Sequence, residues 1–162
     1  NPHTTPILPT PALSFCETAL YDGTMDCPVC REPMMVCEYD QVEIDLCDQC
    51  GGIWLDAGEL ELLFGDRQVA EGYLASGDAA AGRGEAKRRC PICRAKMRKA
   101  VTAGDTPVVY DVCPHGDGLW FDRGELATVL AEGSADPHES QVVAWLRELF
   151  PEEGEQAEAQ AP

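Results

Sequence analysis

Seven of the nine cysteines in this 162-residue chain have a spacing that is typical of metal binding. Three Cys-x-x-Cys pairs stand in the sequence, and the third is followed by a single cysteine. An odd number of cysteines argues against a complete disulfide framework, and paired thiolates usually bind zinc in a reducing compartment. The seven residues are Cys27, Cys30, Cys47, Cys50, Cys90, Cys93 and Cys113.

The first four of these cysteines supply enough thiolates to close the tetrahedron of a zinc ion. A site without an open position is structural rather than catalytic. Iron in the same ligand geometry is the alternative, because similar cysteine knuckles bind both metals. The sequence therefore predicts a structural zinc site between Cys27 and Cys50.

The last three cysteines form a second set that lacks one thiolate, because Gly116 aligns with Cys50. We expect His115 to be the fourth ligand, since imidazole is a common partner of three thiolates. Asp117 or a water molecule is the alternative, and a water would leave a position at which zinc can do chemistry. Two zinc ions per chain are therefore predicted.

The cysteines belong to an internal repeat. Cys27-Pro-Val-Cys-Arg-Glu-Pro-Met34 resembles Cys90-Pro-Ile-Cys-Arg-Ala-Lys-Met97, and the segment from Cys47 to Leu60 resembles that from Cys113 to Leu126. The offset between the copies is 63 residues at the first match and 66 at the second. The difference falls where a hairpin turn is expected, so the pattern predicts two copies of one module.

Hydrophobic patterning predicts the elements that carry these cysteines. Val42, Ile44 and Leu46 alternate with polar residues, which is typical of a strand, and Met35 to Glu38 would be its hairpin partner. In the second copy, residues 99–102 and 108–112 are the corresponding strands. We expect the second knuckle to lead directly into a helix in each copy.

Each of those helices begins with the pattern of a capping box. Asp56 and Asp122 would accept hydrogen bonds from the first-turn amides, while Glu59 and Glu125 would reach back to the Asp amides. We interpret these four carboxylates as structural, and a pair of catalytic carboxylates is the alternative. Apolar residues then give each helix a buried face; they are Leu60, Leu62, Leu63, Phe64, Leu126, Val129 and Leu130.

The predicted fold is a small metal-bound α+β protein with two tandem zinc ribbons and a C-terminal amphipathic helix. A module of roughly 40 residues buries too little surface to fold without its metal. The expected organisation is a Pro-rich extended arm (1–22), ribbon 1 (23–66), a partly helical linker (67–88), ribbon 2 (89–132), the amphipathic helix (133–150) and a disordered acidic tail (151–162).

Two cysteines lie outside both metal-binding sets. Cys37 falls on a predicted strand and is expected to be a small core residue, while Cys16 lies in the N-terminal arm. A redox pair is the alternative, although no neighbouring base supports a reactive thiol.

The motifs of both copies resemble those of the transcription-factor-IIB-type zinc ribbon family. The segment Cys50-Gly-Gly-Ile-Trp-Leu-Asp-Ala-Gly-Glu-Leu60 is the most specific part, and the similarity covers about half of the chain. The resemblance implies a zinc-ribbon fold, with the six paired cysteines and Cys113 as ligands. The family name suggests transcription, but a shared fold is weak support for a function.

The sequence favours a non-catalytic binding or regulatory module that acts as an adaptor between proteins. The apolar stripe of residues 136–150 could lie in a partner's groove, join two copies in a homodimer or pack within the chain, and Trp145 is expected to lie off it. No constellation typical of an enzyme stands out, and an iron-loaded redox protein is a further alternative.

Nucleic-acid binding is the second hypothesis. The net charge of −17 opposes extensive binding to nucleic acid or to an anionic membrane. Eight of the twelve basic residues nevertheless lie in the basic window 83–99, opposed only by Glu85, and they could instead pair with this protein's own acidic surface. The predicted contact residues are Arg88, Arg89, Arg94, Lys96, Arg98 and Lys99.

Neither a secretory signal nor a transmembrane segment is evident, so we expect no membrane partner and a cytoplasmic location.

Overall fold

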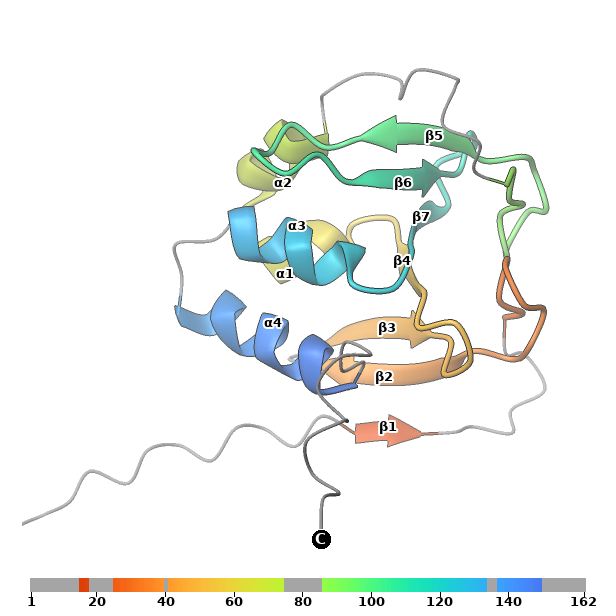
Figure 1. Cartoon of the computed structure of the whole chain (residues 1–162), viewed down its shortest axis with the longest axis horizontal. Helices are drawn as coiled ribbons and strands as arrows, with labels where there is room; N and C mark the ends of the chain where they lie inside the picture. Colours follow the sequence, from red (N-terminus) through yellow and green to blue (C-terminus); the bar gives the residue numbers. More distant parts are fainter. Residues whose placement is uncertain (1–14, 18–24, 40, 75–85, 134–136, 150–162) are drawn as a thin grey trace, which may run out of the picture.

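One antiparallel sheet runs through both repeats in the computed structural model of the chain (Figure 1). The structure describes residues 15–17, 25–39, 41–74, 86–133 and 137–149. Within these ranges the strand order is β1-β2-β3-β4-β7-β6-β5. The strands are β1 (Phe15–Glu17), β2 (Met35–Tyr39), β3 (Val42–Leu46), β4 (Ile53–Asp56), β5 (Arg98–Val101), β6 (Val109–Val112) and β7 (Gly118–Phe121).

The predicted hairpin of each repeat is confirmed. β2 pairs with β3 and β5 pairs with β6, and the alternating residues Val42, Ile44 and Leu46 are buried. β4 and β7 were not predicted, because we expected each second knuckle to lead directly into a helix. These two strands join the repeats: they pair with each other in antiparallel fashion, and Trp54 lies opposite Trp120.

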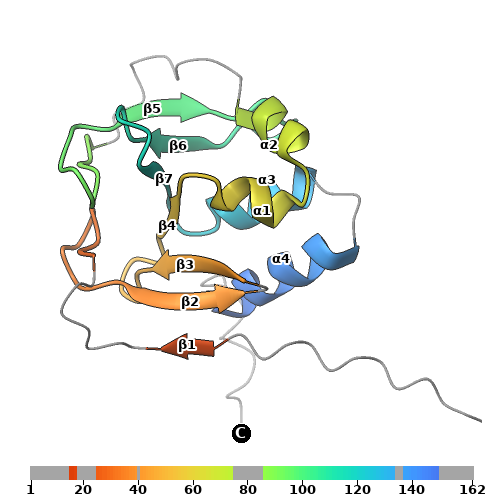
Figure 2. The same ribbon diagram turned by 180° about the vertical axis from the view of Figure 1, so that it is seen from behind.

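Four helices cover the sheet in the described part of the chain: α1 (Glu59–Phe64), α2 (Arg67–Leu74), α3 (Glu125–Gly133) and α4 (Pro137–Leu149). The sheet curves around α1 and α3, and Figure 2 shows the same arrangement from behind. α2 lies in the segment for which a partly helical linker was expected. None of these helices combines the length and apolar character needed to cross a membrane.

The capping-box prediction is half right. Glu59 and Glu125 accept hydrogen bonds from the amides of Asp56 and Asp122, at 2.7 and 2.6 Å. Asp56 does not cap its helix, however, because it ends β4 and accepts a hydrogen bond from the indole Nε1 of Trp54 instead. The N-cap of α1 is Gly58, in the left-handed conformation and without a side-chain cap.

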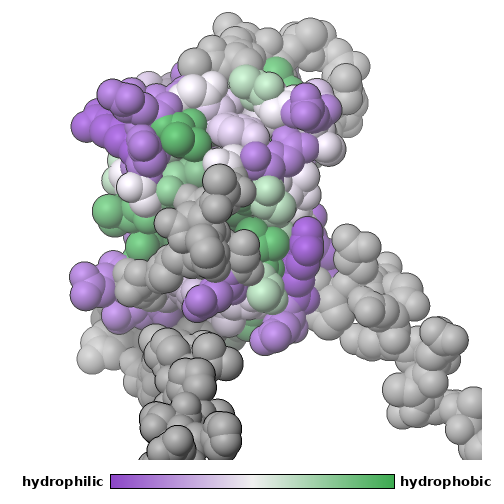
Figure 3. Space-filling model, turned by 90° about the vertical axis from the view of Figure 1, so that its left-hand side faces the viewer, coloured by the Kyte–Doolittle hydropathy of each residue, from purple (hydrophilic) through white to green (hydrophobic). Residues whose placement is uncertain are grey.

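The apolar stripe of α4 packs into the protein's own core. Val142, Val143 and Leu146 are buried beside residues of α1 and α3. Trp145 is half-buried rather than exposed as expected, and its ring centroid lies 5.2 Å from that of Tyr39. Within the described residues, Val142, Val143 and Leu146 of the stripe are therefore covered by the protein's own core. The face of the molecule seen in Figure 3 mixes hydrophilic and hydrophobic residues.

Cys37 is buried in the core as expected, but it is also disulfide-bonded, which was not predicted. The residue opposite Cys37 in the register of β1 and β2 is Cys16. Other predictions lie outside the described residues, namely most of the Pro-rich arm, the two ends of the predicted stripe (136 and 150) and the acidic tail.

Candidate metal centres

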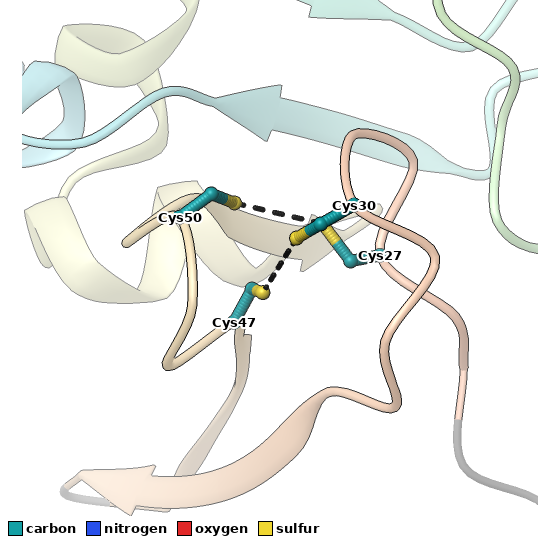
Figure 4. Close-up of side chains that lie close together, drawn as sticks. All are labelled: Cys27, Cys30, Cys47 and Cys50. Atoms are coloured by element: carbon teal, nitrogen blue, oxygen red, sulfur yellow. Dashed lines mark hydrogen bonds between the residues drawn. The ribbon is translucent and has the colours of Figure 1, made fainter.

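The first four cysteines converge from two loops. Cys27 and Cys30 belong to the knuckle before β2, and the other two, Cys47 and Cys50, belong to the turn between β3 and β4 (Figure 4). Three neighbouring Sγ–Sγ distances are 3.3, 3.4 and 3.6 Å. A zinc ion with four thiolates at about 2.3 Å separates the sulfurs by about 3.8 Å, so the cluster fits a tetrahedral zinc site.

Backbone hydrogen bonds hold each loop in shape. The Arg31 amide donates to the Cys27 carbonyl at 3.0 Å, and the Gly51 amide donates to the Cys47 carbonyl at 2.8 Å. Arg31 and Gly51 each follow the second cysteine of their loop directly. Both adopt positive φ, which closes the turn at that point. The Val29 amide also points at the Cys27 sulfur, at 3.4 Å, where it stabilises a thiolate.

The second cluster consists of three cysteines and one carboxylate: Cys90, Cys93, Cys113 and Asp117. The Asp117 Oδ2 lies 3.3 Å from the Cys90 sulfur and 3.2 Å from the Cys113 sulfur. The Cys93 and Cys113 sulfurs are 3.5 Å apart. These separations suit one zinc ion with mixed sulfur and oxygen ligands, for which an S–O edge of about 3.5 Å is expected.

The structure thus places Asp117, the alternative fourth ligand, beside the three cysteines, and it leaves His115, the preferred ligand, outside the cluster. His115 is exposed and is not a member of the cluster, although its backbone amide points at the Cys113 sulfur at 3.4 Å. The geometry of the turn explains the difference: Gly116 adopts positive φ and turns the chain, so that the next side chain reaches back to the thiols.

The cysteine thiols of both clusters need a nearby cation in order to ionise. Burial raises the pKa of Cys50, and it raises the pKa of Cys90 to about 12. Hydrogen bonds from the thiols of Cys93, Cys113 and Cys90 lower the pKa of Asp117. Buried thiols stay protonated without a positive charge, and a bound dication supplies the charge that makes them thiolate ligands.

The two centres share one small core at the same end of the molecule. Trp54, Trp120, Met34 and Met97 are buried against cysteines of both clusters. The knuckles lie side by side in Figures 1 and 2. An ion pair of 3.5 Å between Arg94 and Asp26 links them directly.

The predicted basic contact residues do not form one free surface. Arg88 and Lys99 bind the buried carboxylate of Asp111 at 3.2 and 2.9 Å, so they are structural cations within this chain. Arg94 pairs with Asp26, and Arg89 donates to the Arg94 carbonyl at 3.1 Å. Lys96 lies beside Lys87, whose charge lowers the pKa of Lys96. Arg98 is exposed and has an interaction of its own within the chain.

Sequence reasoning did not identify Asp111 as the binding partner of Arg88 and Lys99. Its signal was present as an acidic residue between apolar ones, one position before the end of its strand, and Asp45 has the same position in the first copy.

The paired knuckles, the short hairpins and the two four-ligand clusters define a protein built from two zinc ribbons that share one sheet. The sequence model of the family described as "Transcription factor zinc-finger" matches residues 26–64 and 89–132, just over half of the chain. The chain belongs to this family of zinc-binding, transcription-related modules. No curated protein and no solved structure gives a significant match.

Proposed function

We propose that this protein is a non-catalytic, zinc-dependent adaptor that binds another protein through the tips of its two knuckles. The observation that carries the proposal is that two four-ligand clusters fix both knuckles at one end of a shared sheet. Every ligand position of a tetrahedral ion has a candidate side chain, which favours a structural role for the metal. A surface that is rigid before binding loses little entropy when a partner docks.

The knuckle tips expose apolar side chains. Val29 occupies the variable position of the first Cys-Pro-x-Cys motif and is 43% exposed. Ile92 has the same position in the second motif and is 49% exposed. Exposed apolar residues held on a rigid loop are suited to insertion into a partner's surface.

Site-specific photo-crosslinking tests the proposal. A photoreactive amino acid at position 29 or 92 should crosslink the same protein in cells that produce this chain. Leu62 is the matched control position, because it is apolar, 64% exposed and located on α1. Val29→Asp combined with Ile92→Asp should abolish the complex and leave both zinc ions bound. Equal crosslinking from position 62, or no protein crosslinked from either knuckle, would contradict the proposal.

Nucleic-acid binding is a second candidate, now restricted to Lys87, Arg89 and Lys96. The close approach of Lys96 to Lys87 favours it, because like charges gather there. Zinc-loaded protein should then bind labelled single- or double-stranded nucleic acid with an affinity that falls steeply with salt. Changing these three residues to Gln should abolish binding, whereas the same change at Arg31, Arg67 and Arg147 should have little effect. Absence of binding at low salt would reject this candidate.

We also propose a cytoplasmic location, supported by the seven cysteines that remain free thiols in the metal clusters. The disulfide of Cys37 is the exception. Metal analysis of the purified protein tests the iron-loaded alternative: we expect two zinc ions per chain and a colourless solution.

A further inference from the structure

Each repeat places three acidic residues around its tryptophan. The first acidic cluster is Asp45, Asp56 and Glu59, and the second acidic cluster is Asp111, Asp122 and Glu125. In both, the first Asp lies opposite the tryptophan across the sheet. The indole Nε1 donates to the second Asp, at 2.7 Å in the first cluster and 3.1 Å in the second.

The second acidic cluster is neutralised from within the chain. The Arg88 guanidinium bridges two carboxylates, 3.2 Å from Asp111 and 2.7 Å from Asp122. Lys99 adds a second cation, 2.9 Å from Asp111. This cluster therefore shows which ligand the constellation binds, namely a guanidinium that contacts both Asp side chains.

The first repeat has apolar residues at both cation positions. Met25 occupies the position that is equivalent to Arg88. The Met25 carbonyl accepts a hydrogen bond from the Met34 amide, as the Arg88 carbonyl does from the Met97 amide. Val36 stands for Lys99, because Val36 pairs with Asp45 across the sheet as Lys99 pairs with Asp111. The first acidic cluster therefore has the same carboxylates as the second but has apolar residues in place of its two cations.

Within the described part of the chain, Asp45 is consequently a mostly buried residue whose carboxylate has no partner. It is only 8% exposed, and among the residues that the structure describes no side chain donates to it or forms an ion pair with it. The charges that act on it come from Asp56 and Glu43, which are also acidic. Burying a charge without compensation is strongly unfavourable, whereas a hydrogen-bonded cation removes most of that penalty.

We propose that the first acidic cluster is a binding site for an arginine side chain of a partner protein, which occupies the place that Arg88 has in the second repeat. The inference rests on the proposed adaptor function and names the chemistry of the partner. A guanidinium suits the site best, because its planar fork can bind Asp45 and Asp56 together. Glu43, exposed on β3 opposite Glu38, extends the negative surface and favours a basic segment around that arginine.

Titration of the zinc-loaded full chain with N-acetylarginine amide tests this proposal by NMR. The indole Nε1–H signal of Trp54 reports on the first acidic cluster, and that of Trp120 is the internal control, because its cluster already holds Arg88. We expect the Trp54 signal to shift saturably, with a dissociation constant of about 1 mM or below for this single residue. The Trp120 signal should not move. The neutral analogue N-acetylcitrulline amide should have no effect.

Two variants make the test specific. Asp45→Asn should weaken arginine binding at least about tenfold while both zinc ions stay bound. Met25→Arg should supply the missing cation from within and abolish the response of Trp54 to added arginine. Either variant suffices if the other does not fold. Asp111→Asn should leave the response of Trp54 unchanged, provided that zinc analysis shows both sites intact.

Several results would overturn the proposal: equal shifts of both indoles, an equal response to citrulline, or unchanged binding to Asp45→Asn. A larger response to magnesium or calcium than to arginine would reassign the site to a metal ion. Movement of the Trp54 signal with protein concentration alone would assign the occupant to a second copy of this chain. The adaptor function is tested separately, since crosslinks from positions 29 and 92 do not depend on this cluster.

Discussion

At the scale of single residues, the two metal centres differ in one ligand. Asp117 takes the position that Cys50 has in the first centre. A carboxylate is a harder ligand than a thiolate, and zinc with thiolate partners is bound more tightly by a fourth sulfur. Cys93 is also exposed, whereas the cysteines of the first cluster are buried or half-buried. The second centre should therefore hold its zinc less firmly.

We predict that zinc leaves the chain in two steps during titration with a chromogenic chelator, and that the second centre releases its ion first. Asp117→Ala should weaken that centre about tenfold or more, and Asp117→Cys should bring the two steps together. His115→Ala is the matched control and should change neither step. If His115→Ala caused a loss of zinc and Asp117→Ala caused none, the fourth ligand would be the imidazole of His115 and not Asp117.

The buried carboxylates Asp45 and Asp111 provide a second prediction at this scale. Burial raises the pKa of Asp45 from 3.8 to about 7, so stability is lost as the pH rises from the ordinary value of 3.8 to about 7 and stays at its reduced level above that. Asp45→Asn should therefore raise the free energy of unfolding at both pH 6 and pH 8, and the gain at pH 8 should exceed the gain at pH 6 by about 1 kcal/mol. Asp111→Asn should lower the free energy of unfolding by about 2 to 3 kcal/mol, because Arg88 and Lys99 lose their charged partner.

Denaturant titrations of the zinc-saturated variants at both pH values measure these differences. Changes of opposite sign for the two substitutions are the expected outcome at pH 8. A decrease in stability for both would show that Asp45 has a partner in solution.

At the scale of elements, the junction of β4 and β7 depends on two glycines that admit the tryptophan of the other repeat. A Cβ atom on Gly52 would collide with the Trp120 ring, and one on Gly118 would collide with the Leu55 carbonyl and the Trp54 ring. Each glycine therefore allows a close approach that any side chain would block. Each repeat thus packs its tryptophan against the glycine of the other repeat, and these two equivalent contacts hold the repeats together.

Gly52→Ala should accordingly destabilise the protein by about 3 kcal/mol, since a rigid ring in a packed core cannot move aside cheaply. Gly72→Ala is the matched control, because Gly72 lies in α2 with open space around its Cβ position. The control substitution should stabilise the protein by about 0.5 to 1 kcal/mol. Thermal unfolding followed by circular dichroism compares them, and similar changes in both would contradict this role of Gly52.

At the scale of the whole molecule, the two ribbons are parts of one folding unit. They share the sheet through β4 and β7, and both metal clusters adjoin one core that contains Trp54 and Trp120. α4 closes the other end by packing on residues of both repeats. Loss of one centre should therefore affect the other.

We predict one cooperative unfolding transition for the zinc-saturated chain, with coincident curves from tryptophan fluorescence and circular dichroism. Cys90→Ser combined with Cys113→Ser should remove the second zinc and also shift the release of the first to lower denaturant concentration. Cys16 and Cys37 remain unchanged in this comparison. Two separate transitions, or an unaffected first centre, would show that the ribbons fold independently.

The sequence by itself determined the parts of the protein whose interactions are local. Spacing within each knuckle predicted the seven cysteines that gather in the two candidate metal clusters. Alternation of apolar residues predicted the hairpins, and the Glu of each capping box reaches back as expected. A turn or a strand is governed by residues a few positions apart, and such patterns can be read along the chain.

The tertiary structure alone decided what depends on residues far apart. β4 and β7 are four residues long, and they pair with each other between residues far apart in the sequence, such as Trp54 and Trp120. The same pairing places Trp54 opposite Trp120. In the folded chain, Arg88 forms an ion pair with Asp111 and is not free to bind another molecule. A charge or an apolar stripe in a sequence does not reveal whether its partner lies within the chain, because burial and ion pairing are settled only when distant segments pack together.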